Sequence, residues 1–130
     1  MVNAHYDRKL ISKGGGVFDR SAKSITLSEQ IKQRFDIEEA RVTPAELIGY
    51  LLCARVDLLW NGGIGTYVKS TEESHTDVGD KTNDALRIDA TELRCLVVGE
   101  GGNLGMTQLG RVEYCLEGGR CNTDFIDNAG

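Results

Sequence analysis

The fold is decided by Cys95-Leu-Val-Val98 and by the loop that follows it, Gly99-Glu-Gly-Gly-Asn-Leu-Gly105. A short apolar run that stops at glycine is typical of a strand buried in a parallel sheet. A helix is then predicted by apolar residues at helical spacing and a glycine stop: Met106, Leu109, Val112, Leu116 and Gly118-Gly119. Thr123-Asp-Phe-Ile-Asp127 is predicted to form the next strand. This order makes a βαβ unit, so we predict an α/β fold, a partial Rossmann-like parallel sheet with flanking helices.

A second apolar run also stops at a glycine loop, since Asp57-Leu-Leu-Trp60 is followed by Asn61-Gly-Gly-Ile-Gly65. Parallel strands end at a common edge of their sheet, and open α/β sheets bind ligands at that edge. We therefore expect the two glycine loops to lie together there. Such an arrangement suits a nucleotide, because glycine lets the backbone approach a ligand and a helix N-terminus favours phosphate. The alternative, that these glycines only form tight turns, stays open on the pattern alone.

The loop at 99–105 departs from the dinucleotide fingerprint GxGxxG, because Leu104 stands where the third glycine belongs. Asp124 or Asp127 follows about 20 residues on, near the position of a ribose-binding acid in that motif. On pattern alone, residues 95–127 would be the first βαβ unit of a Rossmann domain. No catalytic set is evident, since the sequence has no GxSxG and nothing in it fixes a pair of carboxylates together.

Two helices are predicted ahead of these strands. Thr43-Pro-Ala-Glu46 forms a capping box with proline at the first helical position. One buried face is predicted to follow it: Leu47, Ile48, Leu51, Leu52 and Val56. Ser28 can cap a shorter helix that runs to about Arg34. The basic segment Arg20–Ser24 can grip a phosphate, although a polar loop is the favoured interpretation.

Residues 69–83, KSTEESHTDVGDKTN, are polar and acidic, which predicts a surface excursion or lid. His75 stands near three carboxylates that permit a metal site, although a solvated loop is the favoured interpretation: Glu72, Glu73 and Asp77. Asn83 is expected to cap a helix over Asp84–Ile88, with a further turn at Asp89–Leu93.

The composition excludes several classes of protein. The chain has 130 residues, 16 of them glycine, and a net charge of −5 carried by its later, acidic part, which argues against nucleic acid as a partner. Its apolar runs are far shorter than the ~18 residues of a membrane helix, and no signal peptide follows Met1, so we expect no membrane partner. The cysteines form no CxxC motif and have no histidine nearby, so we expect reduced thiols and no metal: Cys53, Cys95, Cys115 and Cys121.

The chain resembles the large bacterial NAD-specific glutamate dehydrogenases over nearly its whole length. The segments that carry the resemblance are Tyr6–Phe18, Arg20–Ile25, Asp57–Tyr67, Val98–Gly105 and Thr123–Gly130. The resemblance implies that residues 1–130 are a fragment, a partial NAD-binding (Rossmann-like) domain from the later part of the dehydrogenase region. Residues 95–127 would then form a later βαβ unit that faces the nicotinamide, and Asp124 and Asp127 would lose the ribose role.

The resemblance also implies NAD as the cofactor. Glu100-Gly-Gly-Asn103 is similar to Glu-Gly-Ala-Asn in relatives, whose asparagine contacts the nicotinamide ribose region. Asn128 matches an asparagine beside the nicotinamide and the substrate, and Asn61-Gly62-Gly63 matches a backbone segment that passes the cofactor. The cofactor-binding residues expected from this similarity are Asn61, Gly62, Gly63, Gly101, Gly102, Asn103 and Asn128.

The implied reaction is the oxidative deamination of L-glutamate to 2-oxoglutarate and ammonium, with hydride passing to NAD. In relatives the catalytic lysine and aspartate lie in the preceding substrate domain, so we expect no catalytic residue in this chain and no activity from it alone. We expect the full-length protein to be cytoplasmic and a homo-oligomer. The alternative hypothesis is a stand-alone nucleotide-binding or regulatory α/β module without catalysis.

Overall fold

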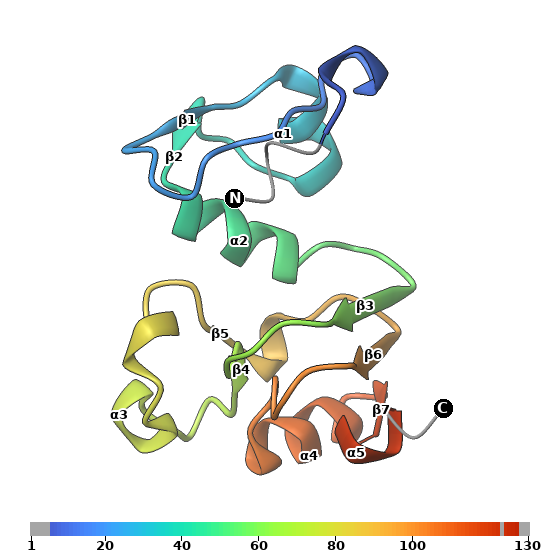
Figure 1. Cartoon of the computed structure of the whole chain (residues 1–130). Coiled ribbons are helices and arrows are strands. Elements are labelled where there is room, and N and C mark those ends of the chain that lie inside the picture. The colour runs from blue at the N-terminus through green and yellow to red at the C-terminus, as the bar shows by residue number, and fades with distance from the viewer. Residues whose placement is uncertain (1–5, 123, 128–130) are drawn as a thin grey trace. The chain divides into compact units, whose positions relative to one another are not determined.

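The structure is a computed structural model that describes residues 6–122 and 124–127. The chain forms two compact units, residues 1–51 and residues 52–130 (Figure 1). The predicted strand and glycine-loop motifs all belong to the second unit. None of the helices in the described ranges is long and apolar enough to cross a membrane.

The first unit pairs two short strands, β1 (Ile25–Thr26) and β2 (Arg41–Val42), in an antiparallel ladder. Helix α1 (Glu29–Phe35) connects them, and the Ser28 hydroxyl caps it by accepting from the Ile31 amide at 3.2 Å, as predicted. The small core of this unit consists of Ile25, Leu27, Ile37, Val42 and Leu47.

Helix α2 (Pro44–Leu52) begins at the predicted capping box. The Thr43 amide donates to the Glu46 carboxylate at 2.8 Å, and the Glu46 amide donates back to the Thr43 hydroxyl at 3.2 Å. The predicted buried face is only partly realised, because Leu47 is buried whereas Leu51 remains 39% exposed. Val56 lies beyond the end of the helix.

The second unit is built on a parallel sheet of three strands in the order β3-β6-β7, namely β3 (Leu58–Asn61), β6 (Val97–Glu100) and β7 (Arg120–Cys121). Helix α4 (Gln108–Leu116) connects β6 to β7 and is followed by Gly118, whose φ is +95°. The βαβ unit and the α/β fold are therefore confirmed: a partial Rossmann-like parallel sheet with flanking helices.

The predicted strand at 123–127 is wrong. The chain pairs with β6 as soon as it leaves the glycine stop, since the Arg120 amide donates to the Leu96 carbonyl at 3.2 Å. The strand is therefore complete at Cys121, and Asp124–Asp127 form a short helix, α5. In this helix the Asp127 carboxylate accepts from the Glu100 amide at 2.8 Å, which holds α5 beside the end of β6.

A second, smaller parallel pair joins β4 (Val68–Lys69) to β5 (Ile88–Asp89). The helix predicted over 84–88 is wrong, because β5 begins at Ile88 and the Asn83 side chain donates to Asp80 at 2.6 Å instead of capping a helix. A 3-10 turn at Lys81–Asn83 precedes it, and another at Ala90–Glu92 agrees with the turn predicted after Asp89.

Helix α4 packs on β4 and β7 through a different face from the one that the apolar residues of its sequence predict. It buries Gly110, Arg111 and Tyr114. Three of the four apolar residues that predicted the helix remain more than half exposed, namely Leu109 56%, Val112 55% and Leu116 83%, whereas Met106, which precedes the helix, is buried. Gly110 allows this close packing, because a Cβ there would lie 3.0 Å from the backbone carbon of Lys69. The core of the unit comprises Val68, Ile88, Ala90, Cys95, Val98, Met106 and Tyr114.

Candidate functional site

The two glycine loops meet at the carboxyl edge of the sheet, as the sequence predicts. Strands β3 and β6 end in register, with Asn61 opposite Glu100. The amides of Gly101 and Gly102 donate to the Asn61 carbonyl at 2.9 and 3.2 Å. A further parallel bridge joins Ile64 to Asn103. The loops at 61–65 and 99–105 therefore form one continuous surface, which we call the loop edge.

Some glycines of the loop edge are required by packing inside the protein. A Cβ at Gly102 would overlap the carbonyl oxygen of Gly63, and one at Gly105 would overlap the side-chain nitrogen of Asn61. A Cβ at Gly101 would lie 2.7 Å from the ring of Trp60, which covers this glycine. Glycine at these three positions brings the two loops and the tryptophan ring together.

Gly62 and Gly63 differ from these, because packing inside the protein does not explain them. A Cβ at either position would meet only an ordinary contact of 3.4 Å, with the Trp60 ring nitrogen or the Tyr67 hydroxyl. Neither glycine has a left-handed φ, and both are exposed. A backbone that is free of side chains and open on its outer face suits the close approach of a ligand.

The other predicted contact residues take different positions. Asn103 is exposed on the loop edge. Asn61 is half-buried, and its side-chain oxygen accepts from the Gly63 amide at 3.4 Å, so it also braces its own loop. Asn128 lies outside the described residues. The structure therefore brings together six of the seven predicted contacts: Asn61, Gly62, Gly63, Gly101, Gly102 and Asn103.

Sequence reasoning missed the buried ion pair beneath the loop edge. The side chain of Glu100 is fully buried, and its carboxylate accepts from the Gly105 amide at 3.0 Å and from the Arg111 guanidinium at 3.4 Å. Arg111 also donates to the carbonyls of Asn122 at 3.1 Å and Met106 at 3.5 Å. No local signal identifies this pair, because Glu100 lies at the end of β6 and Arg111 lies outside the apolar spacing that predicts α4.

Two thiols lie beside this pair, at the junction of α4 and β7. The sulfur atoms of Cys115 and Cys121 are 3.4 Å apart, and both cysteines are free. Burial and the contact with Cys115 raise the pKa of the Cys121 thiol to about 12. A thiol with so high a pKa is a poor nucleophile at neutral pH, so Cys121 is not a candidate catalytic group.

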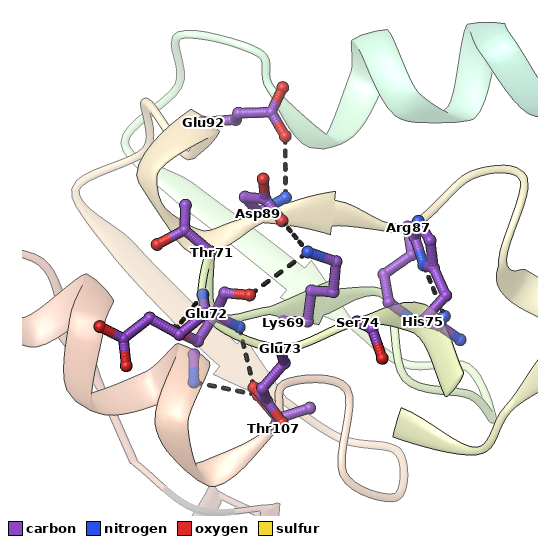
Figure 2. Close-up of polar contacts among 12 residues, drawn as sticks. Lys69, Thr71, Glu72, Glu73, Ser74, His75, Arg87, Asp89, Glu92 and Thr107 are labelled. Atoms are coloured by element: carbon purple, nitrogen blue, oxygen red, sulfur yellow. Dashed lines mark hydrogen bonds and ion pairs between the residues drawn. The ribbon is translucent and has the colours of Figure 1, made fainter. Parts of the chain in front are cut away.

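The beginning of the acidic segment, residues 69–83, is anchored by buried groups, while most of the residues after it are exposed. Lys69 is buried and forms an ion pair with Asp89 (Figure 2). The Glu73 carboxylate accepts from the Ser70 amide at 2.9 Å and from the Thr107 hydroxyl at 2.5 Å. Through Thr107 the segment is tied to the start of α4 and so to the loop edge.

His75 faces an arginine instead of the carboxylates near it in the sequence. Its Nδ1 lies 3.0 Å from the Arg87 guanidinium, as Figure 2 shows. The Arg87 side chain is fully buried, and it donates to the Thr66 carbonyl at 2.7 Å and to Asp84 at 2.6 Å. Within residues 6–122 and 124–127, the structure contains no group of three or more side chains placed to hold a metal ion.

The family of the chain follows from comparison with known proteins. The family model described as bacterial NAD-glutamate dehydrogenase, catalytic domain, matches residues 2–130. The chain belongs to this family. It is 69% identical over 127 residues to the NAD-specific glutamate dehydrogenase of Pseudomonas aeruginosa, and 64% identical over 125 residues to that of Halomonas elongata. The protein of the same name from Mycobacterium tuberculosis is 53% identical over 130 residues.

These alignments cover almost all of the chain but little of its relatives. They include 98%, 96% and 95% of the chain, in the same order, and each covers 8% of the length of the relative. The predicted resemblance to large bacterial NAD-specific glutamate dehydrogenases is confirmed, and the chain corresponds to a small part of such a protein.

Proposed function

We propose that this chain supplies nicotinamide-side cofactor contacts in an NAD-dependent glutamate dehydrogenase, which oxidatively deaminates L-glutamate to 2-oxoglutarate and ammonium. The observation that carries the proposal is the loop edge, where two glycine loops meet in register at the carboxyl end of a parallel sheet. The family match and the names of the relatives support NAD and glutamate as cofactor and substrate.

The residues at the loop edge fit a dinucleotide cofactor. Gly62 and Gly63 leave their backbone open to a ligand, and the exposed Asn103 adds an amide side chain that can donate and accept hydrogen bonds. We assign the cofactor contacts to Asn61, Gly62, Gly63, Gly101, Gly102, Asn103 and Asn128. When bound, NAD supplies the hydride acceptor, and these residues hold and orient its nicotinamide end.

The remaining parts of the proposal concern the whole enzyme. We place residues 1–130 in its partial NAD-binding domain, with the acidic segment at about 69–83 as a surface excursion. The catalytic residues are expected outside this chain, so the chain alone should not turn over glutamate. We propose a cytoplasmic homo-oligomer as the full-length protein.

Replacement of Asn103 by alanine in the full-length enzyme tests the assignment. We expect KM for NAD to rise about tenfold, as for the loss of one good polar contact, with a smaller change in KM for glutamate. Gln33→Ala is the matched control, because it removes an exposed amide from α1 in the first unit. Unchanged NAD kinetics in Asn103→Ala would remove this asparagine from the cofactor site.

A further inference from the structure

The buried carboxylate of Glu100 contacts both the loop between β6 and α4 and the helix that follows it. The Glu100 side chain is fully buried, and its two oxygens serve two different donors. One oxygen accepts from the Gly105 amide at 3.0 Å, which closes the glycine loop on itself. The other accepts from Arg111 on α4 at 3.4 Å, which ties the loop to the helix that follows it.

Arg111 extends this connection to the next strand. Its guanidinium donates to the Asn122 carbonyl, just after β7, and to the Met106 carbonyl, just before α4. The Glu100 amide donates in turn to Asp127 of α5. One buried ion pair thus connects the loop edge to the helix and strand that complete the βαβ unit.

A buried charge is costly unless it is paired and hydrogen-bonded, so two charges in this position call for a reason. An apolar pair could pack here but could not accept from the Gly105 amide. A carboxylate can accept from an amide and a guanidinium at once, since each of its oxygens has lone pairs to spare. We therefore infer that the charge of Glu100 stabilises the conformation of the loop, and that an apolar residue could not replace it in this role.

We propose that Glu100 and Arg111 are positioning residues that fix Gly101–Asn103 in the conformation that receives the nicotinamide end of NAD. The inference rests on the proposed function for its ligand. The hold of the ion pair on the loop is a separate property that can be measured without NAD.

Glu100→Gln in the full-length enzyme is the sharpest perturbation. The amide keeps the size of the side chain, but both of its neighbours are donors, so its NH2 group must face either Gly105 or Arg111. Arg111→Lys keeps the positive charge but loses the fork that serves three carbonyl or carboxylate oxygens at once. Glu29→Gln is the matched control, because it makes the same change of carboxylate to amide in the Lys32 ion pair of α1, in the first unit, and leaves the contacts of Glu100 in place.

Two measurements distinguish the effect of the ion pair on the loop from the role of the loop in binding NAD. Hydrogen exchange of residues 97–107 without NAD should be faster in Glu100→Gln and Arg111→Lys and unchanged in Glu29→Gln. KM for NAD should rise about tenfold in the first two variants, with little change in KM for glutamate, because one charged hydrogen-bond partner is lost.

Unchanged exchange of the loop in a folded Glu100→Gln enzyme would overturn the inference, and so would exchange that rises equally throughout the unit. Faster exchange confined to the loop, with unchanged KM for NAD, would support the hold of the ion pair on the loop and refute the cofactor role of the loop edge. If Glu100→Gln fails to fold, the same two measurements on Arg111→Lys, namely loop exchange and KM for NAD, test the proposal.

Discussion

Gly102→Ala should separate the two glycine loops, because the structure leaves no room for one more carbon atom between them. The added Cβ would overlap the carbonyl oxygen of Gly63. The loops must therefore move apart by roughly an ångström or more to restore an ordinary contact of about 3.5 Å. That movement would break or weaken the hydrogen bonds from Gly101 and Gly102 to the Asn61 carbonyl.

The expected cost can be worked from those contacts. Two hydrogen bonds contribute about 0.5–1.5 kcal/mol each, and overpacking costs about 1–3 kcal/mol when the surroundings cannot yield. The local free energy of opening should fall by about 2 kcal/mol or more, which corresponds to roughly 30-fold faster amide exchange. Hydrogen exchange of residues 97–107 in the full-length enzyme measures this directly.

Gly62→Ala is the control for this prediction, because a Cβ there would meet only the Trp60 ring nitrogen at 3.4 Å. Exchange in the loop should stay close to that of the parent enzyme in this variant. If Gly102→Ala exchanged no faster than Gly62→Ala, the close packing of the two loops would be refuted.

Two further perturbations test other parts of the chain. Ser28→Ala removes the hydroxyl that caps α1 and also donates to the Gly14 carbonyl, so the α1 amides should lose about 1 kcal/mol of protection from exchange; unchanged protection would contradict the capping role. Burial raises the pKa of the Cys53 thiol from 9.0 to about 11, so its alkylation by iodoacetamide should accelerate most between pH 10 and 11. Because the unfolded thiol ionises first, its contribution to stability should decline from about pH 9 upward. A rate that levels off near pH 9 would contradict the raised pKa.

The parts of the fold that were predictable from the sequence depend on local rules. Thr43 and Glu46 form a capping box through neighbouring backbone amides, so their spacing alone identifies the start of α2. The two apolar runs that stop at glycine predicted β3, β6 and the common edge of their loops, although β6 begins two residues later than the run at 95–98 and includes Gly99 and Glu100. These signals need no knowledge of the rest of the chain.

The elements that the sequence predicted wrongly or missed depend on contacts between residues that are distant in the sequence. Residues 84–88 have a plausible helix cap, but β4 lies beside them and pairs Ile88 with Val68 in a parallel ladder. The strand after α4 begins at Arg120 because the Leu96 carbonyl is available there, which no local pattern shows. The Glu100–Arg111 pair likewise joins residues that are 11 apart and lie in different elements.

Leu104 shows how surrounding contacts can impose on leucine a backbone conformation that glycine favours. The sequence has leucine where the dinucleotide fingerprint has its third glycine, yet Leu104 adopts φ +44°, the left-handed conformation that glycine favours. Such a backbone costs roughly 1–2 kcal/mol for an L-residue and persists only where its surroundings impose it. Here the Thr66 hydroxyl donates to the Leu104 carbonyl at 2.9 Å, and Glu100 holds the next amide, that of Gly105. The contacts on both sides thus impose on leucine a turn that a glycine would adopt freely.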